Sequence, residues 1–113
     1  MDDSPRERRV IVKAPVTFEG KGGVIRGNTF NLSLTGCALE SGTDLNNVKM
    51  DATIRLDLFI PTDKKPVKVT RAKVIWTAGN DVGVEFVNMD QTGRGRLRDF
   101  LTKAQAASLK HKS

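Results

Sequence analysis

Apolar and polar residues alternate along most of this chain, and a period of two is typical of β-strands that bury one face. The alternation is clearest over residues 10–18, 54–60 and 82–86. Because successive side chains of a strand point to opposite faces, each of these runs predicts a strand with one face in a core. The chain is therefore expected to be mainly β.

Short stretches rich in Gly, Pro, Asn and Asp separate these runs and predict tight turns. They are EGKGG (residues 19–23), PTDKKP (residues 61–66) and TAGND (residues 77–81). A longer turn-rich stretch, residues 41–51, predicts a loop. Short antiparallel strands joined by hairpins favour a small closed or nearly closed barrel.

Only the end of the chain has helical periodicity. Leu97, Phe100, Leu101 and Ala104 follow the spacing of one helix face, and Asp90 is a candidate N-cap. A chain of 113 residues is the size of one domain. We therefore predict a six-stranded antiparallel β-barrel with a C-terminal α-helix, divided into a flexible arm (residues 1–8), the barrel (9–88) and the helix and tail (90–113).

The run from Val67 to Trp76 contains a phase slip. Val67 and Val69 are in one register, whereas Val74 and Trp76 are in the other. One extra residue near Thr70 and Arg71 reconciles the two registers, which predicts a β-bulge there. With this bulge Trp76 is expected to fill the core or a groove rather than to form a stacking platform.

The run over residues 24–34 contains polar residues that alternation places on one outward face. These are Thr29, Asn31 and Ser33, while Phe30, Leu32 and Leu34 are assigned to the core face. Arg9 and Lys13 fall on the polar face of the preceding run. If the two runs pair as a hairpin, basic and small hydrogen-bonding side chains share one outer surface, with Gly36 in the turn beside it.

Composition points away from catalysis and towards binding. The net charge of +6 favours an anionic partner. The only histidine is His111, and no metal-ligand spacing, phosphate-cradling glycine loop or activated nucleophile is present in the sequence. We therefore expect a non-enzyme with no cofactor.

The sequence also constrains the compartment. A single cysteine, Cys37, fits a reducing compartment and a small buried side chain. No apolar run approaches the roughly 20 residues of a membrane helix, so no membrane insertion is expected. The charged start, MDDSPRERR, argues against a signal peptide.

Two motifs resemble the PilZ domain family. They are RRVIVK (residues 8–13), which is similar to the family's RxxxR, and NLSLTG (residues 31–36), which matches its [D/N]xSxxG. The stretches KVIWTAGNDVGVEFVNMD (residues 73–90) and RLRDFL (residues 96–101) are similar to the family's last strands and helix. The resemblance implies a six-stranded barrel with a C-terminal helix that binds cyclic di-GMP in the bacterial cytoplasm.

The resemblance assigns roles to the basic residues near the start. Arg8 and Arg9 would hold guanine and phosphate, Lys13 would contact phosphate, and Arg6 is a further candidate. Lys13 stands where the family usually has its second arginine. Lysine keeps the charge but lacks the planar fork of arginine, so weaker binding, by about tenfold or more, is expected.

The second motif supplies the other predicted contacts. Asn31 and Ser33 would hydrogen-bond a guanine base or the backbone around it. Gly36 would allow the main chain to approach the ligand, and Cys37 beside it is a further candidate.

Three functions follow as alternatives. The first is a cyclic di-GMP receptor whose arm becomes ordered on binding and changes the surface offered to a downstream protein. The second is an interaction adaptor with the same fold whose RxxxK motif has weakened or lost ligand binding. The third is single-stranded nucleic-acid binding, which needs exposed aromatic rings; it is disfavoured because Phe18, Phe30 and Phe86 are all assigned to core faces.

Overall fold

The structure, a computed structural model, describes residues 10–20, 23–41, 48–61 and 64–112, with side chains placed as far as residue 105. The strands and the helix in this part of the chain are β1 (Pro15–Gly20), β2 (Gly23–Leu32), β3 (Gly36–Ser41), β4 (Thr53–Leu58), β5 (Val67–Ala78), β6 (Asp81–Met89) and α1 (Gln91–Lys112). The predicted arm, residues 1–8, lies outside the described residues, as do residues 42–47 of the predicted loop.

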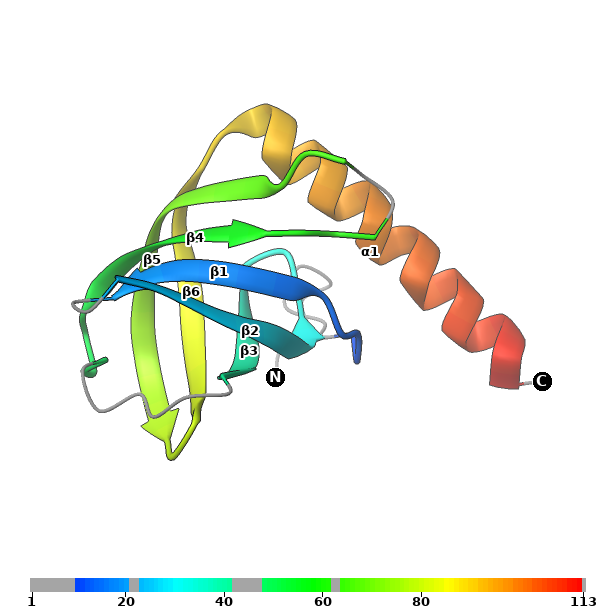
Figure 1. Ribbon diagram of the computed structural model, residues 1–113. Helices are drawn as coiled ribbons and strands as arrows, with labels where there is room; N and C mark the ends of the chain where they lie inside the picture. Colours follow the sequence, from blue (N-terminus) through cyan, green and yellow to red (C-terminus); the bar gives the residue numbers. More distant parts are fainter. Residues whose placement is uncertain (1–9, 21–22, 42–47, 62–63, 113) are drawn as a thin grey trace, which may run out of the picture.

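The strands form a closed antiparallel barrel. Their order around it is β1-β2-β3-β6-β5-β4, and β4 pairs with β1 to complete the ring (Figure 1). Neighbouring strands are consecutive in the sequence, except that β3 pairs with β6 and β1 pairs with β4. The prediction of a six-stranded antiparallel barrel with one C-terminal helix is confirmed.

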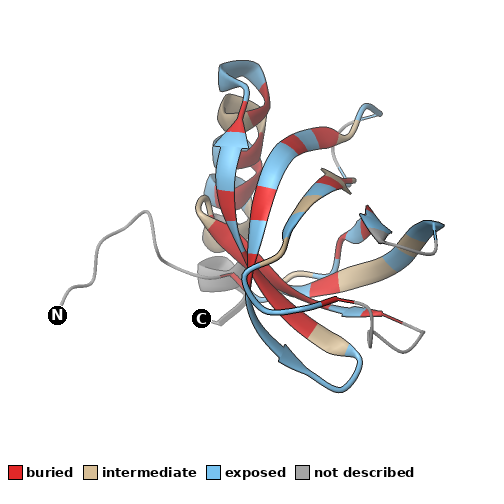
Figure 2. Ribbon diagram, turned by 90° about the vertical axis from the view of Figure 1, so that its left-hand side faces the viewer, coloured by how far each residue is buried: buried red, intermediate tan, exposed pale blue. Residues whose placement is uncertain are grey.

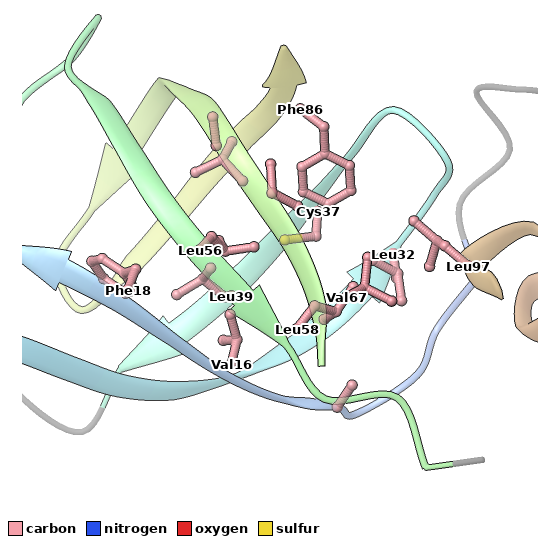
Figure 3. Close-up of a cluster of buried hydrophobic side chains, with 14 of the residues drawn as sticks. Val16, Phe18, Leu32, Cys37, Leu39, Leu56, Leu58, Val67, Phe86 and Leu97 are labelled. Carbon is pink, nitrogen blue, oxygen red and sulfur yellow. The ribbon is translucent and has the colours of Figure 1, made fainter. Parts of the chain in front are cut away.

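The barrel interior holds the apolar side of each predicted strand. Figure 3 shows Phe18, Leu39, Leu56 and other side chains from different strands in one cluster. The thiol of Cys37 belongs to this cluster, with an exposure of 1%. Cys37 is therefore a small core residue, and its thiol cannot contact a ligand on the outer surface.

Strand β5 changes phase twice. The register of β5 shifts around Arg71 against β6, as the predicted bulge requires, and Val69 and Ala72 are both buried. A second shift falls between Val74 and Trp76 and was not predicted. Because of it, Trp76 is 37% exposed on the outer surface. Of the two positions expected for it, the core is therefore wrong, whereas its packing over Gly83 agrees with a side chain that fills a surface groove.

Strand β2 also contains a bulge, and it reverses part of the predicted face assignment. The register against β3 shifts between Thr29 and Asn31, so Phe30 is an extra residue in the strand. Thr29 is 1% exposed, whereas Phe30 is 37% exposed. Simple alternation placed Thr29 outside and Phe30 inside. Both assignments are wrong, because an inserted residue reverses the faces of the side chains on one side of it relative to those on the other.

Helix α1 covers one end of the barrel and then projects away from it (Figure 1). Asp90 Oδ1 accepts a hydrogen bond from the amide of Gly93, which confirms Asp90 as the N-cap. Leu97, Phe100 and Leu101 are buried, and Figure 2 shows buried residues along the part of the helix that faces the barrel. In the described part of the chain, no helix combines the length and the apolar character needed to cross a membrane.

Candidate functional site

The segment before β1 lies against the end of β2. The Val10 amide donates to the Leu32 carbonyl at 2.8 Å, and the Leu32 amide donates to the Val10 carbonyl at 2.9 Å. Arg8 and Arg9 directly precede Val10 in the sequence, and Ser33 directly follows Leu32. The two predicted motifs therefore meet at this pair of hydrogen bonds, although Arg6, Arg8 and Arg9 themselves lie outside the described residues.

Lys13 has an exposed side chain in this segment. Its neighbours Val12 and Ala14 are both hydrogen-bonded to the buried hydroxyl of Thr29, at 2.7 and 2.9 Å. The Thr29 amide also donates to the Ala14 carbonyl at 2.9 Å. The Lys13 backbone is thus fixed beside β2 while its ammonium group extends into solvent.

The turn between β2 and β3 is organised by Ser33. Its side-chain oxygen accepts from the amides of Thr35 at 3.2 Å and Gly36 at 3.1 Å. Its hydroxyl has one proton, and the Gly36 carbonyl lies within hydrogen-bond distance of it at 3.2 Å. Ser33 is 1% exposed, so its predicted position on the outward face is wrong and its hydroxyl is engaged within the turn.

Gly36 is required by the packing of two strands. A Cβ atom at this position would collide with the carbonyl oxygen of Val84 and lie 3.4 Å from Cα of Glu85, both in β6. Among the described glycines, positive φ angles occur at Gly23 and Gly79 and not at Gly36. Gly36 therefore serves the close approach of β3 to β6, and its predicted role of letting the main chain approach a ligand stays a prediction.

Asn31 is the first residue of the second motif and lies next to the bulge in β2. Its side-chain oxygen accepts a hydrogen bond from the Ala38 amide at 3.2 Å, across the bulge from β2 to β3. Because Leu32 and Thr29 point inwards, Phe30 and Asn31 are both on the outside of the strand. The predicted outward orientation of Asn31 is confirmed.

A row of paired residues crosses the outer face from Asn31 to Trp76. Asn31 pairs with Ala38, Ala38 pairs with Gly83, and Gly83 pairs with Trp76, on β2, β3, β6 and β5. With strands spaced about 4.8 Å apart, the two ends of this row are about 14 Å apart at the backbone. The row therefore joins the second motif to an aromatic residue distant in the sequence.

The indole of Trp76 lies over Gly83, its partner in this row. Gly83 stands between the inward-facing Val82 and Val84, so a Cβ at Gly83 would point outwards. That Cβ would collide with Nε1 and Cε2 of Trp76, which places the ring directly over Gly83. Ala38, which pairs with Gly83, also faces outwards but is only 3% exposed.

Lys13, Asn31 and Trp76 together form what we call the outer site. It combines a cation beside β2, an amide on β2 and a partly exposed aromatic ring on β5, all on the outer surface of the barrel. These groups suit an anionic ligand with a planar base, since a cation can contact phosphate and an indole can stack on a base. In the described residues, no group of three His, Cys, Asp or Glu side chains could hold a metal ion.

A family model matches most of the sequence. The model is that of the PilZ domain, and the match covers residues 3–103. The chain belongs to the PilZ domain family. A search of curated proteins finds no match to this PilZ domain.

Solved PilZ structures share the fold at low sequence identity. The inhibitor of motility MotI (DgrA) of Bacillus subtilis is 16% identical with a TM-score of 0.78, and the match covers 93% of this chain and 53% of that one. YcgR of Escherichia coli, solved in complex with c-di-GMP, is 11% identical with a TM-score of 0.74, and the match covers 93% and 47%. The PilZ domain of CeSA from a cellulose-synthesizing bacterium is 12% identical with a TM-score of 0.66, and the match covers 88% and 99%. The chain thus spans about half the length of the first two proteins and nearly the whole of the third.

Two residues of this PilZ domain that matter for the site were not predicted from the sequence. Trp76 was expected to fill the core or a groove and was given no role in the site, and Thr29 was treated as one more polar residue of an outward face. The pattern contained one signal for Trp76, because Gly83 interrupts the apolar run of β6 where a large ring needs room. No comparable signal exists for Thr29, whose role depends on a bulge that pairing alone reveals.

Proposed function

We propose that this PilZ domain protein is a non-catalytic receptor for cyclic di-GMP. The observation that carries the proposal is the Val10–Leu32 pair, which joins the RxxxK segment to the NxSxxG turn on one face of the barrel. The complex of YcgR with c-di-GMP adds support, because part of that protein shares the fold of this chain. The net charge of +6 favours the same anionic ligand.

Each side chain of the outer site has a proposed role in binding cyclic di-GMP. Lys13 contacts a phosphate, Asn31 hydrogen-bonds a guanine edge, and Trp76 stacks on a guanine face. Arg8 and Arg9 reach guanine and phosphate from the arm, with Arg6 as a further contact. Ser33 and Gly36 act indirectly, because their described contacts build the turn that carries this face.

The signal passes to a partner through the arm. Binding of the ligand orders residues 1–8 against the outer site, and this changes the surface presented to a downstream protein. The protein acts in the bacterial cytoplasm, where cyclic di-GMP is made and degraded. An adaptor that has lost this ligand is the competing proposal, and Lys13 in place of arginine is the observation that favours it.

Isothermal titration calorimetry with cyclic di-GMP tests the receptor directly. We expect saturable binding, and cyclic di-AMP serves as the matched control because it has the same phosphates without guanine edges. A short single-stranded oligonucleotide in the same assay tests the nucleic-acid alternative, which the exposed Phe30 and Trp76 rings make relevant. No heat of binding up to several hundred micromolar cyclic di-GMP would reject the receptor in favour of the adaptor.

Replacing Lys13 with arginine is expected to raise the affinity for cyclic di-GMP by about tenfold. The guanidinium group adds a bidentate contact with phosphate or guanine that the ammonium group cannot make. The same titration measures the change. Lys68→Arg is the control, because Lys68 is exposed on β5 outside the outer site; an equal gain in that variant would show a general charge or solvation effect instead.

A further inference from the structure

Thr29 is a buried polar residue whose hydroxyl is hydrogen-bonded on both sides of one exposed lysine. The hydroxyl donates to the Val12 carbonyl at 2.7 Å and accepts from the Ala14 amide at 2.9 Å. The Val12 carbonyl belongs to the peptide group before Lys13, and the Ala14 amide belongs to the peptide group after it. One side chain therefore holds both peptide planes that determine the backbone angles of Lys13.

The ladder of β1 and β2 holds this part of the segment only weakly. β1 begins at Pro15, which has no amide proton, and the Val10–Leu32 pair lies three residues before Lys13. One backbone hydrogen bond, from the Thr29 amide to the Ala14 carbonyl, adds to the two bonds of the hydroxyl. The direction in which the Lys13 side chain leaves the backbone thus depends mainly on Thr29.

We infer that Thr29 is a positioning residue that aims Lys13 at a phosphate of the ligand. The inference rests on the proposed function, in which Lys13 contacts phosphate. A flexible lysine loses less freedom on binding when its backbone is already fixed, and this raises affinity without a new contact. The buried hydroxyl of Thr29 touches no ligand itself, so its effect on binding passes through Lys13.

A double-mutant cycle tests this inference by calorimetry with cyclic di-GMP. Thr29→Val removes the hydroxyl at nearly constant volume and is expected to lower the affinity about tenfold. Lys13→Met removes the ammonium group and is expected to lower it by a similar factor. In the double variant, Thr29→Val should change the affinity by less than about twofold, because the group that it positions is gone.

Two further variants separate positioning from loss of stability. Thr29→Ser keeps the hydroxyl and is expected to bind nearly as well as the natural protein. Val74→Ala removes core volume on β5, where Val74 is 0% exposed, and it should lower the melting temperature without lowering the affinity. If Thr29→Val does not fold, the affinity of Thr29→Ser tests the inference. A Thr29→Ser protein that keeps the hydroxyl but loses affinity would contradict the positioning role.

The outcomes also separate this inference from the proposed function. If the natural protein does not bind cyclic di-GMP, the receptor and the positioning role are both rejected. If it binds, and Thr29→Val costs the same factor with and without Lys13, only the positioning role is rejected. In that case Thr29 acts on stability or on another part of the site.

Discussion

Replacing Gly36 with alanine is expected to destabilise the empty barrel by about 3 kcal/mol. The new Cβ would collide with the Val84 carbonyl oxygen, so β3 and β6 must move apart or give up hydrogen bonds. Urea denaturation followed by circular dichroism measures the loss as a lower midpoint at an unchanged slope. The effect appears without ligand, because the collision is within the fold.

Gly95→Ala is the matched control for this prediction. A Cβ at Gly95 would meet no atom within 4 Å, and Gly95 lies within α1. Alanine is favoured over glycine inside a helix by about 1 kcal/mol, so this variant should be more stable than the natural protein. A Gly36→Ala protein with natural stability but reduced affinity would show that Gly36 instead serves the approach of a ligand.

Replacing Trp76 with alanine is expected to lower the affinity for cyclic di-GMP between about tenfold and a hundredfold. Stacking of a base on an aromatic ring contributes about 1–3 kcal/mol per base. The indole lies over Gly83, and Trp76 is 37% exposed. Titration calorimetry measures the change at a temperature where circular dichroism shows the variant folded. The effect should persist at high salt, because stacking does not depend on charge.

Two variants accompany Trp76→Ala. Trp76→Phe keeps an aromatic face and should retain most of the affinity. Ile75→Ala removes the neighbouring side chain, which is 38% exposed, and should leave the affinity unchanged. If Trp76→Ala binds as tightly as the natural protein, the ring only covers the barrel surface, and the outer site is limited to Lys13, Asn31 and the arm.

Local patterns in the sequence predicted the elements well. The apolar face of β4 and the cap at Asp90 depend on neighbours two or three residues away. Both could therefore be predicted from the local sequence. The bulge in β5 was also predictable, because the apolar residues on either side of Thr70 and Arg71 are out of phase. Short hairpin-linked strands favoured a closed or nearly closed barrel, and the structure shows the closed form.

The site was predicted less completely, and the reason is again a bulge. Phe30 interrupts β2 without any change in the apolar pattern, since Thr29 and Ser33 are polar whichever way they point. Alternation therefore identified the outward Asn31 but placed Ser33 beside it on the surface. In the structure Ser33 points inwards and accepts a hydrogen bond from the Gly36 amide in the turn. The Thr29 hydroxyl is hydrogen-bonded to the backbone next to Lys13.

The sequence by itself determined that the chain forms short strands followed by one capped C-terminal helix, because side-chain period and capping are properties of the chain. Only the tertiary structure decided what surrounds the RxxxK and NxSxxG motifs. Trp76 reaches the outer site from a strand 45 positions after Asn31 in the sequence. It does so because β6 lies between β3 and β5 in the barrel wall and Gly83 leaves space for the ring. Pairing between distant strands and the bulges that adjust it fix which polar groups face solvent, and neither depends on local sequence alone.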